Sequence, residues 1–254
     1  MKKLYSTILI LALLLISTAA FSQFNMLYVG DIANDADSSL TGYFTDAGYT
    51  VTLISGTELA ALTTPEQYTD YDVIFIAEVI GSSDANGFRT AGWPIPAVTT
   101  EGYVARTGRW DLLEDNATQF LQVASADIDD DLRYLVIDNE EHYITKWYNL
   151  DDEVSWSSKE NLAETGNEAG VTGSKLDVTN SDAIQLAHFK TTSMVEFPCM
   201  WAIPAGSANF LGEGINSNIV ILGLHYNGLT GGYGTDAYHD LMLRSVQWAT
   251  DNPS

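Results

Sequence analysis

The chain has 254 residues, 46% of them hydrophobic, which is enough apolar material for one α/β domain with a full core. Its formal net charge is −23 at pH 7, from 34 acidic and 11 basic side chains. So acidic a surface repels nucleic acid and anionic lipid, and both are excluded as expected partners. Solubility is the simplest explanation of the acidity.

The first 22 residues have the pattern of an export signal. Two lysines follow Met1, ILILALLLI at 8–16 is too short to span a bilayer, and AFS at 20–22 is a small-x-small cleavage site. We therefore expect a signal peptide over residues 1–22, cleavage before Gln23, and a secreted or periplasmic protein without a membrane anchor. The mature chain would carry a charge of −25 (−23 − 2), because the segment contains two lysines and no acids.

Residues 26–77 contain three short strand-like runs, with a helical segment between the first two. MLYVG at 26–30 breaks at a Gly-Asp pair, 38–48 has apolar residues at helical spacing, TVTLI at 50–54 is β-branched, and VIFIA at 73–77 is apolar throughout. This succession predicts a parallel sheet covered on both faces. The right-handed crossover rule places the first and third strands side by side, with the second outside the first.

The later elements are shorter. Helical segments are expected at 57–61, 65–68 and 110–113, and a further helix that carries Phe88 should follow a cap at Ser83 or Asp84. A fourth strand, flanked by proline, is expected at 95–100, and an exposed loop at 159–175. Strands are expected at 134–138, at 154–158 as an edge, at 183–189 and 194–203 as an antiparallel pair, and at 218–224 as a central partner of 73–77. The last helix should start at Thr235 or Asp236 and bury Tyr238, Leu241, Met242, Ser245 and Ala249.

Together these elements predict one α/β domain over residues 23–254. Its flavodoxin-like, mostly parallel sheet would have helices on both faces, with an inserted antiparallel β region between roughly 125 and 210. Cys199 is the only cysteine, so no internal disulfide can form. It lies in the apolar run FPCMWA, which favours a buried inert thiol over a nucleophile.

In an open parallel sheet, ligands bind beyond the carboxyl ends of the strands, near the switch in strand order. The polar residues that follow the expected strands are therefore the candidate site. They are Asp31, Glu78, Ser82, Ser83, Glu101, Tyr103, His142, His225, Tyr226 and Asn227. Carboxylates, a histidine and hydroxyls on one edge could hold a divalent metal or a sugar. Glu101 or Asp31 would be the catalytic base, and His225 the acid or metal ligand.

Each candidate also has a structural explanation. Asp31 could cap the first helical turn, Glu101 could be a solvated turn residue, and His225 could be a neutral core histidine. His142 could fix a turn. Of the other histidines, His188 is expected to be a satisfied strand residue and His239 a surface residue.

Two further patterns are weak. The acidic run 127–131 lacks the glycine and the distant glutamate of an EF-hand, so a solvated loop is favoured over a calcium site; no metal site or cofactor is predicted. Several aromatic residues fall in or near loops, where exposed rings would stack on sugars and buried rings would fill the core. They are Trp93, Tyr103, Trp110, Trp147, Tyr148 and Trp156.

Four stretches give the chain a resemblance to the trehalose-utilisation (ThuA-like) proteins of the class I glutamine amidotransferase-like, flavodoxin-like fold. They are the first strand with the helix ending AGYTVTLI, YTDYDVIFIA with its Gly-Ser-Ser turn, IDNEEHYIT at 137–145, and NIVILGLHYN at 218–227 before the helix ending SVQWA. At Tyr143 the family usually has proline. Amidotransferases of this fold also place a cysteine in a G-x-C-x-G elbow, which this chain lacks, so thiolate glutaminase chemistry is not expected.

The resemblance favours a secreted, non-catalytic ThuA-like module that binds a carbohydrate or another extracellular protein at the carboxyl edge of the sheet. The alternative is a sugar-active hydrolase or isomerase with carboxylate and histidine chemistry, with or without a metal. A third hypothesis is a structural protein with a vestigial cleft. Exposed aromatics in an open cleft would support the first, and converging groups with a shifted pKa the second. A pocket filled by Trp or Tyr would support the third.

Overall fold

The computed structural model describes residues 24–31, 33, 35–123, 130–159, 171–179, 183–224, 229 and 232–251. The expected signal peptide, most of the acidic run 127–131, and His225, Tyr226 and Asn227 lie outside these ranges. Within the described ranges, no helix is both long and apolar enough to cross a membrane.

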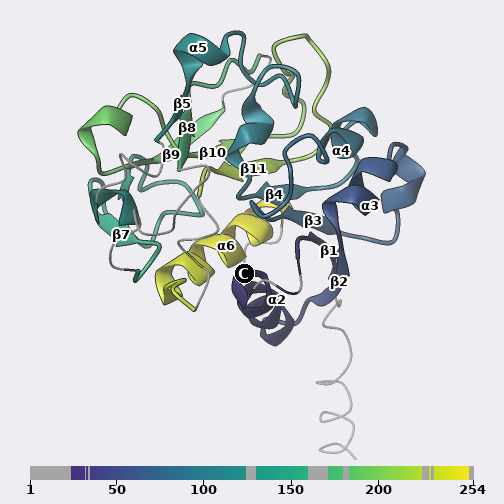
Figure 1. Cartoon of the computed structure of the whole chain (residues 1–254), viewed down its shortest axis with the longest axis horizontal. Coiled ribbons are helices and arrows are strands. Elements are labelled where there is room, and N and C mark those ends of the chain that lie inside the picture. The colour runs from purple at the N-terminus through teal and green to yellow at the C-terminus, as the bar shows by residue number, and fades with distance from the viewer. Residues whose placement is uncertain are drawn as a thin grey trace, which may run out of the picture.

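One sheet of nine strands organises the molecule, in the order β2-β1-β3-β4-β11-β10-β9-β6-β7 (Figure 1). The first five are parallel: β2 (Thr50–Ile54), β1 (Asn25–Val29), β3 (Val73–Ile76), β4 (Ala97–Thr99) and β11 (Ile219–Leu222). The other four are antiparallel to their neighbours: β10 (Met200–Ile203), β9 (Ile184–Phe189), β6 (Tyr134–Ile137) and β7 (Glu153–Ser155). The structure thus confirms the mostly parallel, flavodoxin-like α/β sheet, the order of its first three strands and its antiparallel extension.

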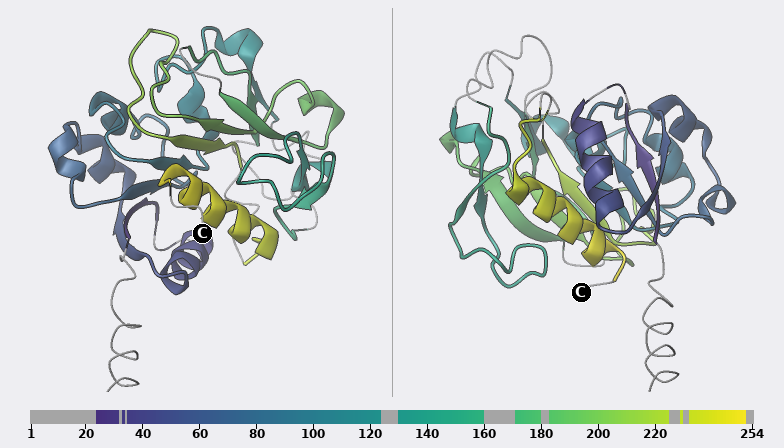
Figure 2. Two further views of the ribbon diagram at one scale, coloured as in Figure 1. Left: turned by 180° about the vertical axis from the view of Figure 1, so that it is seen from behind. Right: turned by 90° about the horizontal axis from the view of Figure 1, so that it is seen from below.

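Helices cover both faces of the parallel half. Helices α2 (Asp35–Asp46) and α6 (Asp236–Ala249) lie side by side on one face, while the short α3 (Gly56–Ala61) and α4 (Asn86–Thr90) lie on the other (Figure 2). Successive side chains of a strand point to opposite faces of the sheet, so each strand contributes to two apolar clusters, one on each face. Met26 and Tyr28 of β1 join the apolar cluster beneath α2 and α6, whereas Leu27 and Val29 join the cluster beneath α3 and α4.

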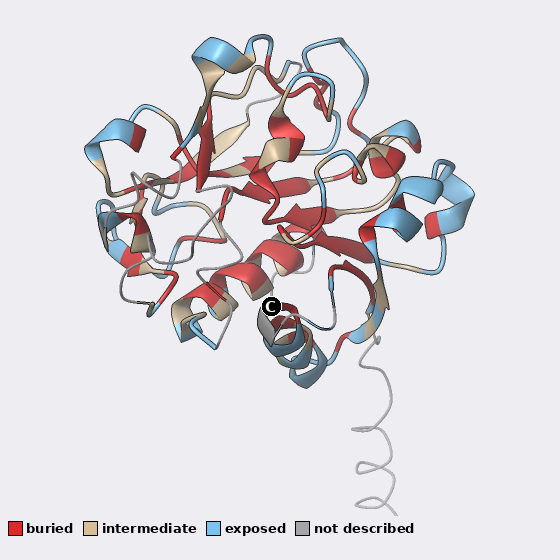
Figure 3. Cartoon of the chain, viewed as in Figure 1, coloured by how far each residue is buried: buried red, intermediate tan, exposed pale blue. Residues whose placement is uncertain are grey.

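Caps set where the helices begin. Thr235 accepts a hydrogen bond from the Tyr238 amide at the start of α6, and the buried face of α6 contains all five residues that the sequence predicts (Figure 3). Ser55 and Glu58 form a capping box at α3. Helix α4 instead begins after Ala85, without the side-chain cap expected from Ser83 or Asp84.

The remaining elements are single turns and one small sheet. They are the 3-10 helices η1 (Pro65–Tyr68), η2 (Gly102–Ala105), η4 (Asp130–Arg133) and η6 (Thr192–Met194), the turn of helix α5 (Asn116–Gln119), and the antiparallel pair β5 (Phe120–Gln122) and β8 (Thr172–Ser174).

Four further sequence predictions of local structure were wrong. Segment 110–113 is not helical, because Asp111 has a φ of 50°, in the left-handed region. Strand β11 pairs with β4 and β10 rather than with β3, because β4 lies between them. The end of the expected exposed loop 159–175 is the buried strand β8, and the strand expected from 194 begins only at Met200.

Candidate functional site

The carboxyl ends of β3 and β4 bring two acidic residues next to each other. The Glu78 amide donates to Thr100 Oγ1 at 3.1 Å, which ties the two strand ends together. Glu101 follows directly and begins η2, where its Oε1 accepts a hydrogen bond from the Tyr103 amide at 2.8 Å. Both carboxyl side chains are buried, with Glu78 9% and Glu101 4% exposed, so Glu101 is not a solvated turn residue.

Burial dominates the chemistry of Glu101. It raises the pKa of this carboxyl to about 8, although the Tyr103 amide and the charge of Arg109 both act to lower it. The side chain is therefore protonated at neutral pH and can donate a hydrogen bond. Its φ of −81° is ordinary, so this strand end is not a strained nucleophile elbow. Burial and the Glu101 charge together raise the pKa of Tyr103 to about 12.

Arg109 connects this edge to the turn after β3. Its Nε donates to Ser82 Oγ at 3.1 Å, and its charge acts on Glu101. The structure therefore groups Glu78, Ser82, Glu101 and Tyr103 at one edge. Ser83 lies in the same turn but is exposed.

Asp31 does not join this group. It is exposed, and its Oδ1 accepts a hydrogen bond from the Ala33 amide at 2.9 Å, as a turn or capping residue does. The Asp31 amide donates in turn to Asp37, a buried acid of α2 that also accepts the Tyr28 hydroxyl at 2.8 Å. Burial raises the pKa of Asp37. The sequence offered no signal for this pair, because Asp37 resembles any acid in a first helical turn.

His142 lies at the opposite edge of the sheet from Glu101. Strand β6 runs antiparallel to β9, and two further antiparallel pairings make its direction opposite to that of β4. Burial lowers the pKa of His142 to about 4, its Nδ1 accepts from the Ile144 amide at 3.3 Å, and its ring lies 5.2 Å from that of Trp248. These contacts agree with the turn-fixing alternative.

The other histidines and the cysteine have structural surroundings. His188 pairs with Asp138 at 2.7 Å, as expected of a satisfied strand residue. His239 is half-buried rather than on the surface, and stacks on Tyr43 with ring centroids 5.0 Å apart. Cys199 is buried, its pKa is raised well above the usual value by burial, and the thiol is therefore inert as predicted.

The described part of the carboxyl edge is tightly packed. A Cβ at Gly102 would lie 1.9 Å from Thr172 Oγ1, and one at Gly223 would lie 2.1 Å from the Thr172 carbonyl oxygen. Among the described residues, no three His, Cys, Asp or Glu side chains are grouped to hold a metal ion. The edge therefore contains a protonated buried carboxyl, beside a close packing of Gly102 and Gly223 on Thr172.

The aromatic residues divide sharply by exposure. Trp93, Trp110 and Trp156 are buried in the core, whereas the side chain of Trp147 is 70% exposed. Trp147 borders a depression of about 220 Å³ on the α6 side of the molecule. We call this region the Trp147 surface; it is lined by Tyr143, Trp147, Asp240, Leu243, Arg244 and Gln247.

The Trp147 surface combines an indole with cationic and polar groups. The Arg244 guanidinium lies 5.9 Å from the Trp147 ring centroid and 5.4 Å from that of Tyr148. Arg244 Nη1 donates a hydrogen bond to the Ile144 carbonyl oxygen at 3.2 Å, and its Nη2 forms an ion pair with Asp240 at 3.6 Å. These contacts fix the guanidinium beside an exposed ring. The sequence placed Trp147 among the loop aromatics but could not separate it from the buried ones.

Comparisons with known proteins assign no family to this chain. No family model and no curated protein matches it. Among solved structures, it is similar to a chain of PurLQS from Thermotoga maritima, at 10% identity and a TM-score of 0.47, over 89% of this chain and 99% of that one. It is also similar to a protein from Thermoplasma acidophilum that is described as part of a GMP synthase, at 8% identity and a TM-score of 0.44, over 90% and 96% of the two chains. Neither likeness assigns an activity.

Proposed function

We infer that this protein is a secreted, non-catalytic ThuA-like module that binds carbohydrate through the Trp147 surface. The observation that carries this proposal is the exposed indole of Trp147 beside Arg244. The Trp147 ring is 70% exposed and so is open to stacking by a ligand, and burying its apolar surface against one would be favourable.

The groups around Trp147 suit a sugar. The flat indole can pack against the apolar C–H face of a pyranose ring, while hydroxyl groups need donors and acceptors at the rim. Asp240, Arg244 and Gln247 supply these from one face of α6. At about 220 Å³, the depression is smaller than sites that enclose a whole drug-sized ligand, so it suits one ring of a longer chain.

This proposal moves the binding site away from the carboxyl edge that the sequence favoured. Glu101 there is 4% exposed, and Gly102 beside it packs closely on Thr172. Lys146, whose Nζ lies 4.2 Å from the Tyr143 ring centroid, adds positive charge near Trp147 in an otherwise acidic chain. Uronic acid-containing chains are therefore expected to bind better than neutral ones.

The test is affinity electrophoresis and calorimetric titration with neutral and uronic acid-containing oligosaccharides. Trp147→Ala should weaken binding at least tenfold, or about 1.4 kcal/mol. Leu150→Ala is the matched control, because Leu150 is a nearby apolar residue that is 52% exposed but does not line the depression. Retained affinity in Trp147→Ala, or no binding of any oligosaccharide by the wild-type protein, would remove the carbohydrate proposal and leave a protein partner as the ligand.

A second candidate function rests on Glu101. A carboxyl with a pKa of about 8 is suited to protonating a leaving group, as a sugar-active hydrolase requires, and Glu78 is a second buried acid whose charge, like that of Glu101, acts on Tyr103. If the protein has this function, it should hydrolyse a glycoside. The hydrolysis should be lost in Glu101→Gln and retained in Trp147→Ala. Sugar binding that survives in Glu101→Gln, without turnover in the wild-type protein, supports the module instead.

A further inference from the structure

A second depression lies next to the Trp147 surface, between the same two stretches of chain. Its volume is about 410 Å³, which falls within the range of small-molecule sites, roughly 300–1,000 Å³. One wall comes from residues 148–155, which end in β7, and the other from residues 235–237 at the start of α6; β7 contacts α6 (Figure 1). We call it the Tyr148 depression, after a residue of its first wall.

The residues of α6 that line the two depressions share one face of the helix. At spacings of three or four residues, one stripe of the helix contains Asp236, Asp240, Arg244 and Gln247. From the first to the last of these, α6 rises about 16 Å, or about three turns. A pyranose unit lengthens a sugar chain by about as much as one helical turn rises, so the stripe is as long as about three linked units.

Arg244 joins the two depressions. Its guanidinium lies 5.9 Å from the centroid of the Trp147 ring, which borders one depression. It lies 5.4 Å from the centroid of the Tyr148 ring, which borders the other. The two depressions are therefore parts of one groove between α6 and residues 143–155, and one ligand can contact both.

Hydrogen bonds between the two walls fix the groove at both ends. At the start of α6, Thr235 Oγ1 donates to the Ser155 carbonyl oxygen at 2.6 Å. Near the other end of the helix, the Tyr143 hydroxyl donates to Gln247 Oε1 at 3.0 Å. The walls are thus held in place without a ligand, and a groove that is already formed lowers the cost of binding.

The end of the groove at Trp147 carries a net positive charge. Arg244 is balanced there by Asp240 at 3.6 Å. Lys146 adds a second cation, with its Nζ 5.6 Å from the Trp147 ring centroid. A carboxylate on the sugar unit that stacks on Trp147 is therefore attracted to this end.

The Tyr148 depression carries the opposite charge. The described residues that line it include no base and three acids, namely Asp152, Glu153 and Asp236. Lys190 pairs with Glu153 at 3.0 Å and so offsets one of the three charges. Carboxylates at this end accept hydrogen bonds from hydroxyl or ammonium groups, but they repel another carboxylate.

We propose that one oligosaccharide occupies both depressions, with a uronic acid unit at Trp147 and units without a carboxylate, neutral or amino sugars, in the Tyr148 depression. This inference rests on the proposed function and makes its ligand more specific. The difference in charge between the two ends selects a mixed chain over a chain made only of uronic acids.

The test is calorimetric titration of the purified protein with two series of oligosaccharides. Members of the mixed series have a single glucuronic acid at one end of one, two or three xylose units. Members of the acidic series consist of two, three or four galacturonic acid units. Affinity should rise about tenfold from the shortest to the longest mixed chain, because the added units enter the Tyr148 depression. It should stay level or fall along the acidic series, because the added carboxylates meet the acidic wall.

A charge reversal tests the wall directly. Asp236→Lys should let the acidic series gain affinity with length, because a cation then faces the added carboxylates. The matched control is Asp70→Lys, which changes the total charge equally. Asp70 is an exposed acid between η1 and β3 that lines neither depression, so its replacement should leave both series as in the wild type.

The outcomes separate this inference from the function on which it rests. If the longest mixed chain binds no more tightly than the shortest, while Trp147→Ala still weakens binding, the Trp147 surface binds one unit and only this inference fails. It also fails if both series gain equally with length, or if Asp236→Lys and Asp70→Lys behave alike. If no member of either series binds the wild-type protein, the carbohydrate function itself is wrong.

Discussion

Glu101 shows how one buried residue can make the stability of the whole protein depend on pH. Its carboxyl is 4% exposed and has a folded-state pKa of about 8, whereas an unfolded glutamate titrates near 4.3. Between these values, the folded protein holds a proton that the unfolded chain has released. The stabilisation is therefore complete below about pH 4.3 and is lost as the pH rises to about 8.

We predict that Glu101→Gln removes this dependence. Glutamine imitates the protonated carboxyl, so the variant should resemble the wild type near pH 4.5 and exceed it increasingly toward pH 8. The wild-type free energy of unfolding should fall relative to the variant by about 1.4 kcal/mol per pH unit in this window. Urea unfolding of both proteins from pH 4 to 9 measures the difference, and parallel curves would contradict the prediction.

Trp147 and Trp93 show that the exposure of a single aromatic ring cannot be predicted from the local sequence. Both tryptophans lie outside helices and strands, yet Trp147 is 70% and Trp93 1% exposed. Exposure of a single ring depends on which distant segment covers it. Trp93 is covered because it packs edge-on against Trp110 within a buried cluster that also contains Phe88, whereas the Trp147 ring stays exposed. No local pattern carries that information.

At the scale of the elements, the junction of β4, β8 and β11 depends on glycines. Gly102→Ala would place its Cβ 1.9 Å from Thr172 Oγ1 and 2.8 Å from the Gly223 Cα. Because the backbone of Gly223, directly after β11, is hydrogen-bonded to Cys199 and Thr172 and cannot move away without breaking these bonds, we predict destabilisation of about 3 kcal/mol or more. For a domain of this size this corresponds to a fall in Tm of about 6–12 °C.

Gly42→Ala is the matched control for that substitution. Gly42 lies inside α2, and a Cβ there meets no atom within 4 Å. Alanine should therefore stabilise the helix by about 0.5–1 kcal/mol. Thermal unfolding measures both substitutions. If Gly102→Ala and Gly42→Ala change Tm in the same direction, the packing at the junction does not exclude a Cβ, and the prediction is wrong.

Strands β1 to β4 could be predicted because each carries its own signal. Runs such as VIFI at 73–76 are buried on both faces, and the handedness of crossovers then fixes their order. Strands β5 and β8 have no such signal. Each has three residues, and Thr172–Ser174 is a Thr-Gly-Ser sequence that is strand-like only because Phe197 and Gly223 pack on it.

The candidate site was partly predictable for the same reason. Topology alone placed Glu101 at the end of β4, beside Glu78. It could not place His142, because the direction of β6 depends on three successive antiparallel pairings that local sequence does not determine. The left-handed conformation of Asp111 was equally invisible, and it turned an apparently helical segment into a bend.

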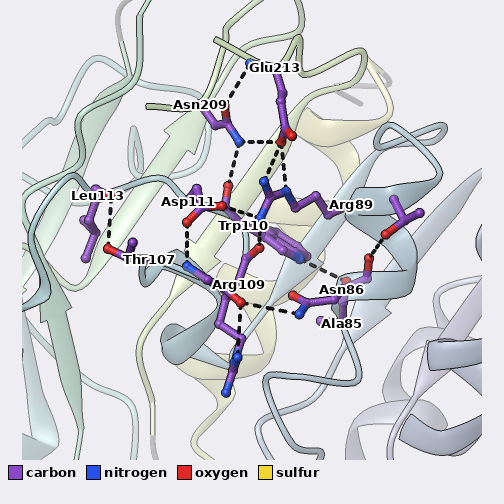
Figure 4. Close-up of polar contacts among 12 residues, drawn as sticks. Ala85, Asn86, Arg89, Thr107, Arg109, Trp110, Asp111, Leu113, Asn209 and Glu213 are labelled. Atoms are coloured by element: carbon purple, nitrogen blue, oxygen red, sulfur yellow. Dashed lines mark hydrogen bonds and ion pairs between the residues drawn. The ribbon is translucent and has the colours of Figure 1, made fainter. Parts of the chain in front are cut away.

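At the scale of the whole molecule, Arg89 joins three segments that are far apart in sequence. From α4 it contacts Asp111 in the loop after η2 and Glu213 in the loop before β11 (Figure 4). The Asp111 carboxylate is 6% exposed and also accepts the Gly108 amide, so its charge depends on Arg89 for compensation. Removing one partner of a buried pair leaves an uncompensated charge, at a cost of about 3–5 kcal/mol.

We therefore predict that Arg89→Met lowers the free energy of unfolding by about 3 kcal/mol or more in chemical denaturation. Adding Asp111→Asn should restore much of the loss. Asparagine tolerates the left-handed conformation of residue 111 and can still accept the Gly108 amide, but it carries no charge. Glu213→Gln alone should cost less, because that side chain is 48% exposed and water can solvate it. If the double variant is no more stable than Arg89→Met, packing of the arginine rather than its charge holds the three segments together.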